Sequence, residues 1–220
     1  MQRRPIVILI SGRGSNMRSL IDFSLRPDAD AAYRVAQVLS DQPGAAGLVS
    51  ARESGIPALA LPCPKGTSRE GYGDLLSAEI DKHQPALVAL AGFMRILPPA
   101  FVRHYSGRLL NIHPSLLPKY TGLHTHRRAL DARDAEHGAT VHFVTEQLDE
   151  GPRIIQARVP VLAGDSEDSL SARVIAQEHR IYPLAVQWFC QGRLRGDDRR
   201  AWLDDEPLDE PVQFSAEQLA

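Results

Sequence analysis

The sequence predicts an α/β protein built on one mostly parallel, twisted sheet of about seven strands, with helices on both faces. Short β-branched runs alternate with stretches of helical periodicity from the start of the chain, which is typical of βαβ units. The first run, Ile6–Ile10, is entirely apolar, as expected for a strand that is covered on both sides. It meets a glycine-containing turn at once.

The elements of the first half follow in a regular order. After the turn, apolar residues recur at helical spacing from Met17 to Leu25. Further strands are expected at Tyr33–Leu39, Pro57–Leu61 and Ala86–Ala91, with helices at Ala45–Ser54 and Ser68–Lys82 between them. Gly55 is well placed to end the first of these helices. This alternation predicts a Rossmann-like N-terminal half.

In the second half, Pro98 and Pro99 favour a helix start before the strand Arg108–His113, which Pro114 prevents from continuing. The remaining elements expected are a helix at Thr125–Asp134, strands at Thr140–Val144 and Arg153–Val161, and a long helix at Ser166–Phe189. Residues 197–220 carry eight acidic and two basic side chains. We expect one domain over residues 1–196 and a solvated acidic extension over residues 197–220.

Composition excludes several classes of protein. The net charge of −2 shows no basic excess of the kind that binding to nucleic acid requires. Ile6–Ile10 is too short to span a bilayer or to act as a signal peptide. Cys63 and Cys190 are isolated, which suits a reducing compartment. We expect a cytoplasmic monomer or homodimer that binds small molecules, but neither nucleic acid nor membranes.

The turn Ser11–Asn16 is the first candidate binding site. A glycine-rich turn between a strand and a helix exposes backbone N–H groups and the positive helix end to an anion. Its glycines allow close approach, and Ser15 and Asn16 can cap the helix or add hydrogen bonds. Met17 stands where a dinucleotide fingerprint needs a third glycine, so a single phosphate is favoured. A tight turn without a ligand is the alternative.

Asn111 and His113 are candidate catalytic residues at the end of a strand. Residues two apart project to the same face, at the sheet edge where α/β proteins bind ligands. An amide beside an imidazole can stabilise an oxyanion and pass a proton to a leaving nitrogen. Asp149, in the loop Leu148–Pro152, is a candidate partner for the imidazole, with Glu150 as a weaker competitor. The alternatives are hydrogen bonds within a turn and, for Asp149, a solvent-exposed position.

His124, His126 and His142 raise the question of a zinc site. The sequence contains no HExxH motif, no cysteine ligand set and no tight spacing that links these residues to His113. We therefore expect no metal. His124 and His126 are expected to shape the start of a helix, and His142 to be a hydrogen-bonded interior group.

The motifs together resemble those of one family, the folate-dependent phosphoribosylglycinamide formyltransferases of purine synthesis. The matching segments are ISGRGSNMRSLID, LAGFMRIL, LLNIHPSLLPKYTGLHTHRRAL, EHGATVHFVTEQLDEGP and AGDSEDSLSARVIAQEHRIYPLAVQWF. The similarity extends through residue 206. It implies a single formyltransferase-type domain that moves the formyl group of 10-formyltetrahydrofolate to the amine of glycinamide ribonucleotide, without a metal.

The resemblance also implies roles for individual residues. Gly14, Ser15 and Asn16 would hold the phosphate of glycinamide ribonucleotide, and Glu178 would contact its ribose or glycinamide portion. The catalytic residues would be Asn111, His113 and Asp149. The folate would be bound by Arg69, Met94, Arg95, Ile96, Leu97 and Asn111. Arg13, Thr121 and Ile175 depart from the family's pattern, so their contacts are left open.

Four other functions are compatible with parts of the sequence. A formyltetrahydrofolate hydrolase or a methionyl-tRNA formyltransferase would use similar Asn and His positions, but each carries an additional domain for which we expect no room. A nicotinamide-dependent oxidoreductase would explain the strand–glycine–helix opening and could use Asp41 on a ribose. A non-catalytic nucleotide sensor would retain the phosphate turn alone.

Overall fold

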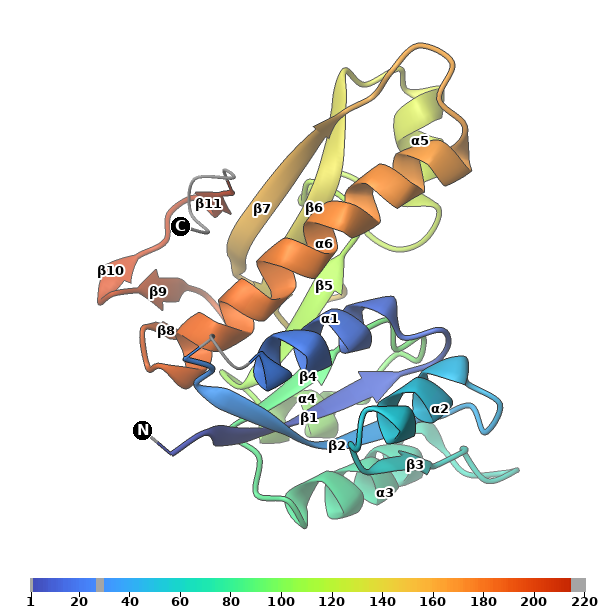
Figure 1. Cartoon of the computed structure of the whole chain (residues 1–220), viewed down its shortest axis with the longest axis vertical. Coiled ribbons are helices and arrows are strands. Elements are labelled where there is room, and N and C mark those ends of the chain that lie inside the picture. The colour runs from blue at the N-terminus through green and yellow to red at the C-terminus, as the bar shows by residue number, and fades with distance from the viewer. Residues whose placement is uncertain (1, 27–29, 215–220) are drawn as a thin grey trace.

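The computed structural model describes residues 2–26 and 30–214. The strands are β1 (Arg4–Ile10), β2 (Tyr33–Ser40), β3 (Ala58–Ala60), β4 (Leu87–Leu90), β5 (Leu109–His113), β6 (Glu136–Phe143), β7 (Arg153–Pro160), β8 (Leu194–Gly196), β9 (Ala201–Leu203), β10 (Glu206–Pro207) and β11 (Val212–Gln213). The helices are α1 (Ser15–Leu25), α2 (Ala46–Glu53), α3 (Arg69–Asp81), α4 (Pro99–His104), α5 (Thr125–Asp131) and α6 (Glu167–Cys190) (Figure 1).

Eight strands form the main sheet in the order β11-β7-β6-β5-β4-β1-β2-β3. Neighbouring strands run parallel, except that β6 is antiparallel to both β5 and β7. The prediction of a mostly parallel sheet is therefore confirmed. The strands expected from the sequence account for seven of the eight, and β11 is the addition.

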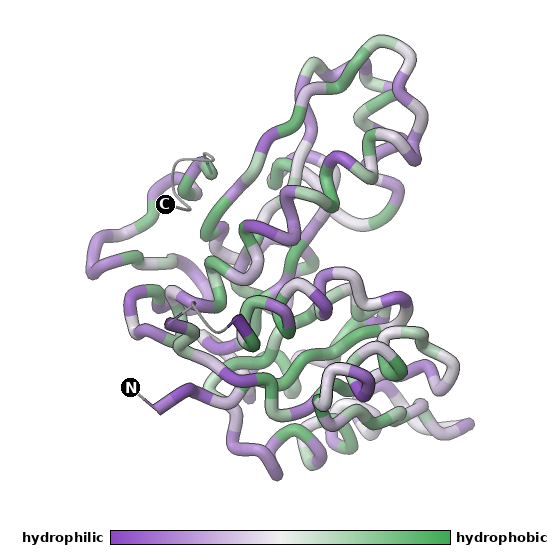
Figure 2. The backbone as a smooth tube through the Cα atoms, viewed as in Figure 1, coloured by the Kyte–Doolittle hydropathy of each residue, from purple (hydrophilic) through white to green (hydrophobic). Residues whose placement is uncertain are grey.

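Both faces of the sheet are covered, as the apolar strands predict. On β1, Ile6, Ile8 and Ile10 pack into a core that α1, α2 and α6 complete. Val7 and Leu9 point the other way, into a smaller core with α3 and α4. Hydrophobic residues accordingly gather in the central strands (Figure 2). The helices of both layers hold the carboxyl ends of these strands in a fixed frame.

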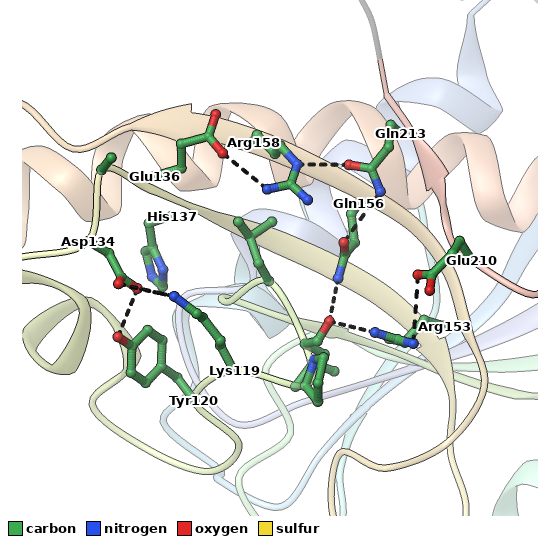
Figure 3. A pocket seen from close by; sticks show the side chains of 14 residues that line it. Lys119, Tyr120, Asp134, Glu136, His137, Arg153, Gln156, Arg158, Glu210 and Gln213 are labelled. Carbon is green, nitrogen blue, oxygen red and sulfur yellow. Dashed lines mark hydrogen bonds and ion pairs between the residues drawn. The ribbon is translucent and has the colours of Figure 1, made fainter. Parts of the chain in front are cut away.

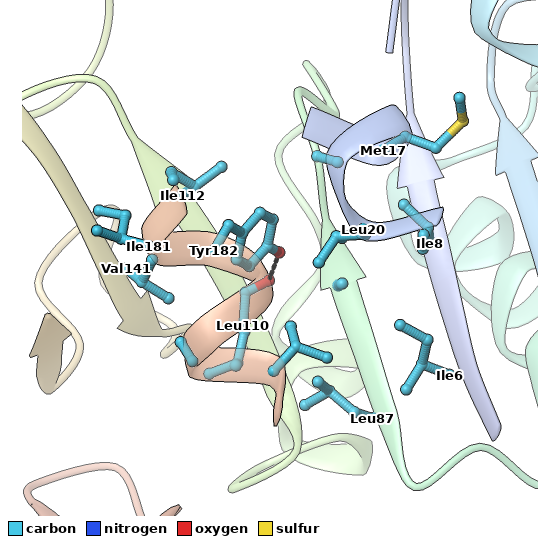
Figure 4. Packing of buried hydrophobic residues seen from close by; sticks show 14 of the residues in the cluster. Ile6, Ile8, Met17, Leu20, Leu87, Leu110, Ile112, Val141, Ile181 and Tyr182 are labelled. Carbon is cyan, nitrogen blue, oxygen red and sulfur yellow. Dashed lines mark hydrogen bonds between the residues drawn. The ribbon is translucent and has the colours of Figure 1, made fainter. Parts of the chain in front are cut away.

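Helix α6 fixes the central strands from one face. It begins with a capping box between Ser166 and Ser169. Further along, the buried Tyr182 hydroxyl lies 3.1 Å from Leu110 O (Figure 4) and 2.9 Å from Leu90 O, and it donates a hydrogen bond shared between the two carbonyl groups. This hydroxyl joins α6 to β4 and β5 just before Asn111. No helix within residues 2–26 and 30–214 has the length and apolar character needed to cross a membrane.

Two element boundaries differ from the prediction by more than two residues. Strand β6 begins at Glu136 rather than Thr140. The prediction started the strand too late because Gly138 weakens the sequence signal for a strand, although packing requires a glycine there. A Cβ atom on Gly138 would lie 2.0 Å from Ala157 O on the neighbouring strand. The helix expected over Thr125–Asp134 ends at Asp131.

The expectation of a solvated appendage is wrong for residues 197–214. Strands β9 and β10 extend β8 into a small three-stranded sheet, and β11 pairs with the edge strand β7 of the main sheet. Ala201 is buried, and Val212 and Phe214 pack against the large core. The apolar residues between the charges therefore anchor this segment. Residues 215–220 lie outside the described part, and the division at residue 196 stays a prediction.

Candidate active site

The sheet order brings three candidate segments to one edge. Strands β1, β4 and β5 are parallel neighbours, so the loops that follow them start at the same edge. Strand β6 runs the other way and ends opposite the start of β5, where Phe143 faces Leu110. The loop after β6 must therefore fold back along the sheet to bring Asp149 to the end of β5.

Asp149 does reach His113. Its Oδ2 lies 3.5 Å from His113 Nδ1, and the two side chains are each 7% exposed. The same oxygen accepts a hydrogen bond from the Gly122 backbone N–H at 2.9 Å. Asp149 has a φ of 57°, which allows the loop to make this turn. Asp149 is thus not the solvent-exposed residue of the alternative interpretation, whereas its competitor Glu150 is exposed.

Both ring nitrogens of His113 face acceptors. Nε2 lies 2.8 Å from the Tyr120 carbonyl oxygen, which can only accept, so Nε2 carries a hydrogen. Nδ1 faces the Asp149 carboxylate. An imidazole with an acceptor at each ring nitrogen is held in a fixed orientation.

Asn111 is oriented by a residue for which the sequence suggested only an interior role. His142, directly opposite on β6, lies with its Nε2 3.2 Å from Asn111 Nδ2. Burial lowers the pKa of His142 to about 4, so the ring is neutral near pH 7. Its Nδ1 donates to Phe143 O at 2.9 Å, which leaves Nε2 to accept from Asn111. His142 Nε2 also lies 3.8 Å from Asp149 Oδ1, but a nitrogen that accepts from Asn111 has no hydrogen for the carboxylate, so the two are neighbours without a bond.

The sequence could not identify this role of His142. The pairing of Asn111 with His142 depends on the register of two antiparallel strands, and a shift by one residue would turn His142 to the other face. The relevant signal is the strand EHGATVHF within the matched segments, but its register cannot be obtained from periodicity.

The phosphate turn differs in detail from the expectation. Gly14 occupies the N-cap of α1 with a φ of 75°, and no side chain caps the helix, so of the two roles expected for Ser15 and Asn16, capping is not found. Asn16 Nδ2 instead donates to Glu178 Oε2 of α6 at 2.7 Å. Burial raises the pKa of Glu178, and the hydrogen bond from Asn16 opposes this shift. The first backbone N–H groups of α1 are therefore left without a side-chain partner.

The segment Met94–Leu97 follows β4 and presents apolar side chains to solvent. Met94 is 73% exposed and Ile96 is 65% exposed. Arg95 lies over the Tyr72 ring of α3, with its Cζ 4.9 Å from the ring centroid, and Leu97 packs against the smaller core. Uncovered apolar side chains beside a guanidinium suit a flat heterocycle that carries polar groups.

The other residues singled out by the sequence lie around this edge. Arg69 is the first residue of α3, and its half-exposed side chain lies 3.8 Å from Glu70. Arg13 is exposed, and Ile175 precedes Glu178 by one turn of α6. The carbonyl oxygen of Thr121 accepts a hydrogen bond from Arg128 at 2.6 Å.

The three histidines considered as metal ligands do not come together. His126 Nδ1 lies 3.1 Å from His137 Nε2, whereas His142 contacts Asn111. Within residues 2–26 and 30–214, no group of three or more His, Cys, Asp or Glu side chains is arranged to hold a metal ion.

A polar cavity of about 430 Å³ lies beside the loop after β5, but the candidate catalytic residues do not line it. Figure 3 shows its side chains paired with one another: Lys119 with Asp134, and Arg158 with Glu136. Internal pairing of this kind leaves few groups for a ligand. We therefore place the candidate site at the ends of β1, β4 and β5.

The approach of Asp149 depends on a glycine two residues further on. A Cβ atom at Gly151 would lie 1.9 Å from Phe143 O, so the Gly151→Ala variant must displace the loop. We expect a destabilisation of about 1–3 kcal/mol, the usual range for overpacking. Turnover should fall with it, because Asp149 moves away from His113. Thermal unfolding and initial rates, with Gly44→Ala as control, check this; at Gly44 a Cβ meets nothing within 4 Å. Unchanged values would contradict the packing argument.

Comparisons with known proteins identify the family of the chain. The sequence profile of the formyl transferase family matches residues 4–186. The chain is 54% identical over 213 residues to the phosphoribosylglycinamide formyltransferase of Escherichia coli (strain K12), covering 97% of this chain and 99% of that relative. It is 42% identical over 205 residues to the Haemophilus influenzae enzyme of the same name, covering 93% and 96%.

A solved structure gives the same result. The phosphoribosylglycinamide formyltransferase of Coxiella burnetii is 45% identical and superposes with a TM-score of 0.92, covering 97% of this chain and 100% of that one. Because the family profile matches most of the length of the chain, the chain belongs to the formyl transferase family.

Proposed function

We propose that this chain transfers the formyl group of 10-formyltetrahydrofolate to the amine of glycinamide ribonucleotide, as a step of purine synthesis. One observation carries the proposal. Asn111, oriented by His142, and His113, oriented by Asp149, lie two residues apart at the end of β5, at the same sheet edge as the uncapped start of α1. The names of the similar proteins, phosphoribosylglycinamide formyltransferases, support the nucleotide acceptor and the transfer of a formyl group.

The ribonucleotide is proposed to bind at the turn before α1. Gly14, Ser15 and Asn16 offer backbone N–H groups at a helix end that favours a phosphate. Within the described residues, Asn16 Oδ1 is buried without a hydrogen-bond partner, so an N–H or O–H group of a ligand would satisfy it. Glu178, fixed by the other side of the same amide, would lie beside the ribose or the glycinamide.

The formyl donor is proposed to bind along Met94–Leu97. The exposed Met94 and Ile96 side chains fit an apolar ring face, and Arg95 and Arg69 would lie near the polar portion of the folate. Asn111, at the neighbouring strand end, would contact the donor's formyl oxygen. No metal enters this assignment.

The reaction needs an attacking amine, a stabilised oxyanion and a proton for the leaving nitrogen. The neutral amine attacks the formyl carbon directly. Asn111 Nδ2 has a second hydrogen besides the one shared with His142, and it would stabilise the developing oxyanion together with the charge of protonated His113. Asp149 keeps that charge in place and positions a water that carries the proton to N10 of the folate. Fixing two small reactants in attack geometry contributes on the order of 7–11 kcal/mol in favourable models.

The test is a coupled assay with purified protein, glycinamide ribonucleotide and 10-formyltetrahydrofolate. We expect formation of tetrahydrofolate and formylglycinamide ribonucleotide that depends on both substrates. Loss of the formyl group without the nucleotide would instead indicate the hydrolase. The hydrolase and oxidoreductase alternatives find no support in the similar proteins. The oxidoreductase would also use Asp41, but that carboxylate is buried and bonded to Ser11.

Replacing Asp149 by asparagine should change the pH dependence of turnover more than substrate affinity. The amide can still accept from Gly122 N–H but carries no charge. The variant removes the charge that faces His113 Nδ1 and leaves the loop contact in place, so the shape of the profile should change while both KM values stay close to wild type. Profiles of kcat against pH for wild type, Asp149→Asn and the exposed control Asp131→Asn check this. Superimposable profiles would remove Asp149 from the proton pathway.

The remaining proposals concern the setting of the enzyme. We propose that it acts in the cytoplasm as a monomer or homodimer on small molecules, without nucleic acid or membrane partners. The free thiols Cys63 and Cys190 suit such a compartment.

A further inference from the structure

The two ligand-binding loops are joined by a side chain that the proposed mechanism does not use. Ser11 Oγ accepts a hydrogen bond from the Met94 backbone N–H at 2.8 Å. The Ser11 backbone N–H donates to Gly92 O at 3.0 Å. The loop that begins at Ser11 continues into the phosphate turn at Gly14, and the loop at Met94 begins the proposed folate segment. Ser11 is therefore the direct connection between them.

Asp41, the residue that follows β2, fixes the direction of this connection. Its Oδ1 accepts a hydrogen bond from the Ser11 hydroxyl at 2.6 Å. The hydroxyl hydrogen is thus committed to Asp41, and an oxygen lone pair is left for the Met94 N–H. Oδ2 accepts from Gln42 Nε2 at 2.9 Å, and the Asp41 side chain is only 2% exposed. A buried carboxylate bonded at both oxygens holds its donors in defined positions.

The same carboxylate restrains the charged residue of the folate segment. Arg95 Nη1 lies 3.7 Å from Asp41 Oδ2, and the guanidinium also lies over the Tyr72 ring. Burial, followed by the charge of Asp41, raises the pKa of Tyr72 to about 12, so its ring stays neutral. Met94 and Ile96 point into solvent and add little packing of their own. Leu97 packs against the smaller core at one end of the segment, and at the other end the orientation of Met94 and Arg95 depends on Ser11 and Asp41.

We propose that Asp41 and Ser11 are positioning residues that hold Met94–Leu97 in the orientation that binds the formyl donor. This inference rests on the proposed function, which assigns the segment to the folate. Neither residue is catalytic, because each acts through the Met94 backbone or the Arg95 side chain. We call the contacts of Ser11 and Asp41 with Met94 and Arg95 the Ser11–Asp41 joint. Loss of these contacts should weaken binding of 10-formyltetrahydrofolate and leave binding of glycinamide ribonucleotide unchanged.

The first test is steady-state kinetics of the Ser11→Ala variant. Removing the acceptor of Met94 N–H should raise KM for 10-formyltetrahydrofolate about tenfold, since one hydrogen bond contributes on this scale. We expect a smaller change, of less than about twofold, in kcat and in KM for glycinamide ribonucleotide, because Asn111 and His113 are unaltered and Gly14–Asn16, the part of the turn proposed to hold the phosphate, keeps its place at the start of α1. Ser11→Thr, which keeps the hydroxyl, should restore the donor KM. Ser54→Ala, at a serine that bonds within α2, is the matched control.

Asp41→Asn tests the carboxylate separately. The amide oxygen can still accept from Ser11, but the ion pair with Arg95 is lost. In this variant, too, KM for 10-formyltetrahydrofolate should be higher than in wild type, without a matching change in KM for glycinamide ribonucleotide. Equal changes in both KM values, or a loss confined to kcat, would overturn the proposal, because a general loss of structure acts on both substrates.

A readout without substrates separates this proposal from the proposed function. In Ser11→Ala protein, exchange of the Met94 amide hydrogen should accelerate about tenfold relative to wild type, for the same lost hydrogen bond. An unchanged exchange rate of the Met94 amide hydrogen would overturn the proposal that Ser11 holds this segment. If instead the wild-type protein transfers no formyl group to the ribonucleotide while Met94 exchange responds as expected, the proposed function fails and the joint remains.

Discussion

The His113→Ala variant is expected to lose at least ~100-fold in turnover, the usual scale for removing a general acid–base group. The substitution removes the imidazole that lies between the Tyr120 carbonyl oxygen and the Asp149 carboxylate. Because Asp149 keeps its hydrogen bond from Gly122 N–H, the loop should stay folded. The loss should therefore fall on kcat rather than on the thermal midpoint.

The measurement is the coupled formyl-transfer assay, with thermal unfolding as a check of integrity. His104→Ala is the matched control, since His104 is exposed and contacts Asp81 on the outer helices. Near-normal turnover by folded His113→Ala protein would defeat the catalytic assignment. A parallel loss in the His104 variant would point to a general effect of removing histidines.

The Asn111→Ala variant should show a second large effect, again at least ~100-fold in kcat, as for the loss of an oxyanion-hole donor. The structure gives the reason that this amide is pre-oriented. His142 Nε2 accepts one of its hydrogens, and the ring is fixed in turn by Phe143 O. An amide held in this way loses no freedom when the oxyanion forms.

The Asn111 prediction is checked by kcat and KM for both substrates. The alanine leaves His142 Nε2 without its donor, so thermal unfolding must accompany the kinetics. Gln147→Ala, which removes an exposed amide from the loop after β6, is the control. If kcat stays within about tenfold of wild type, the oxyanion role belongs elsewhere.

Much of the fold could be predicted because short-range sequence patterns indicate its strands and helices. The apolar run of β1 and the helical spacing after it identify both elements, and Pro99 and Ser166 mark helix starts that the structure reproduces. The register of β6 could not be predicted in this way. Its first residues include Gly138, and a glycine weakens the sequence signal for a strand. The close contact with Ala157 on the neighbouring strand nevertheless requires a glycine at this position.

The candidate site divides along the same line. The spacing of Asn111 and His113 on one strand already places both at a sheet edge. The contact of His113 with Asp149 spans a loop that turns back through a positive φ, which spacing cannot predict. The contact of Asp41 with Ser11 joins two different strand ends.

The sequence by itself thus determined the alternation of strands and helices, the phosphate turn and the Asn111–His113 pair, because each depends on residues that are neighbours in the chain. Only the tertiary structure decided which distant groups meet them: His142 opposite Asn111, Asp149 beside His113, and β11 on the edge of the sheet. Those contacts depend on strand register, on the close approach that a glycine permits, and on burial shared between segments. None of these has a local signature.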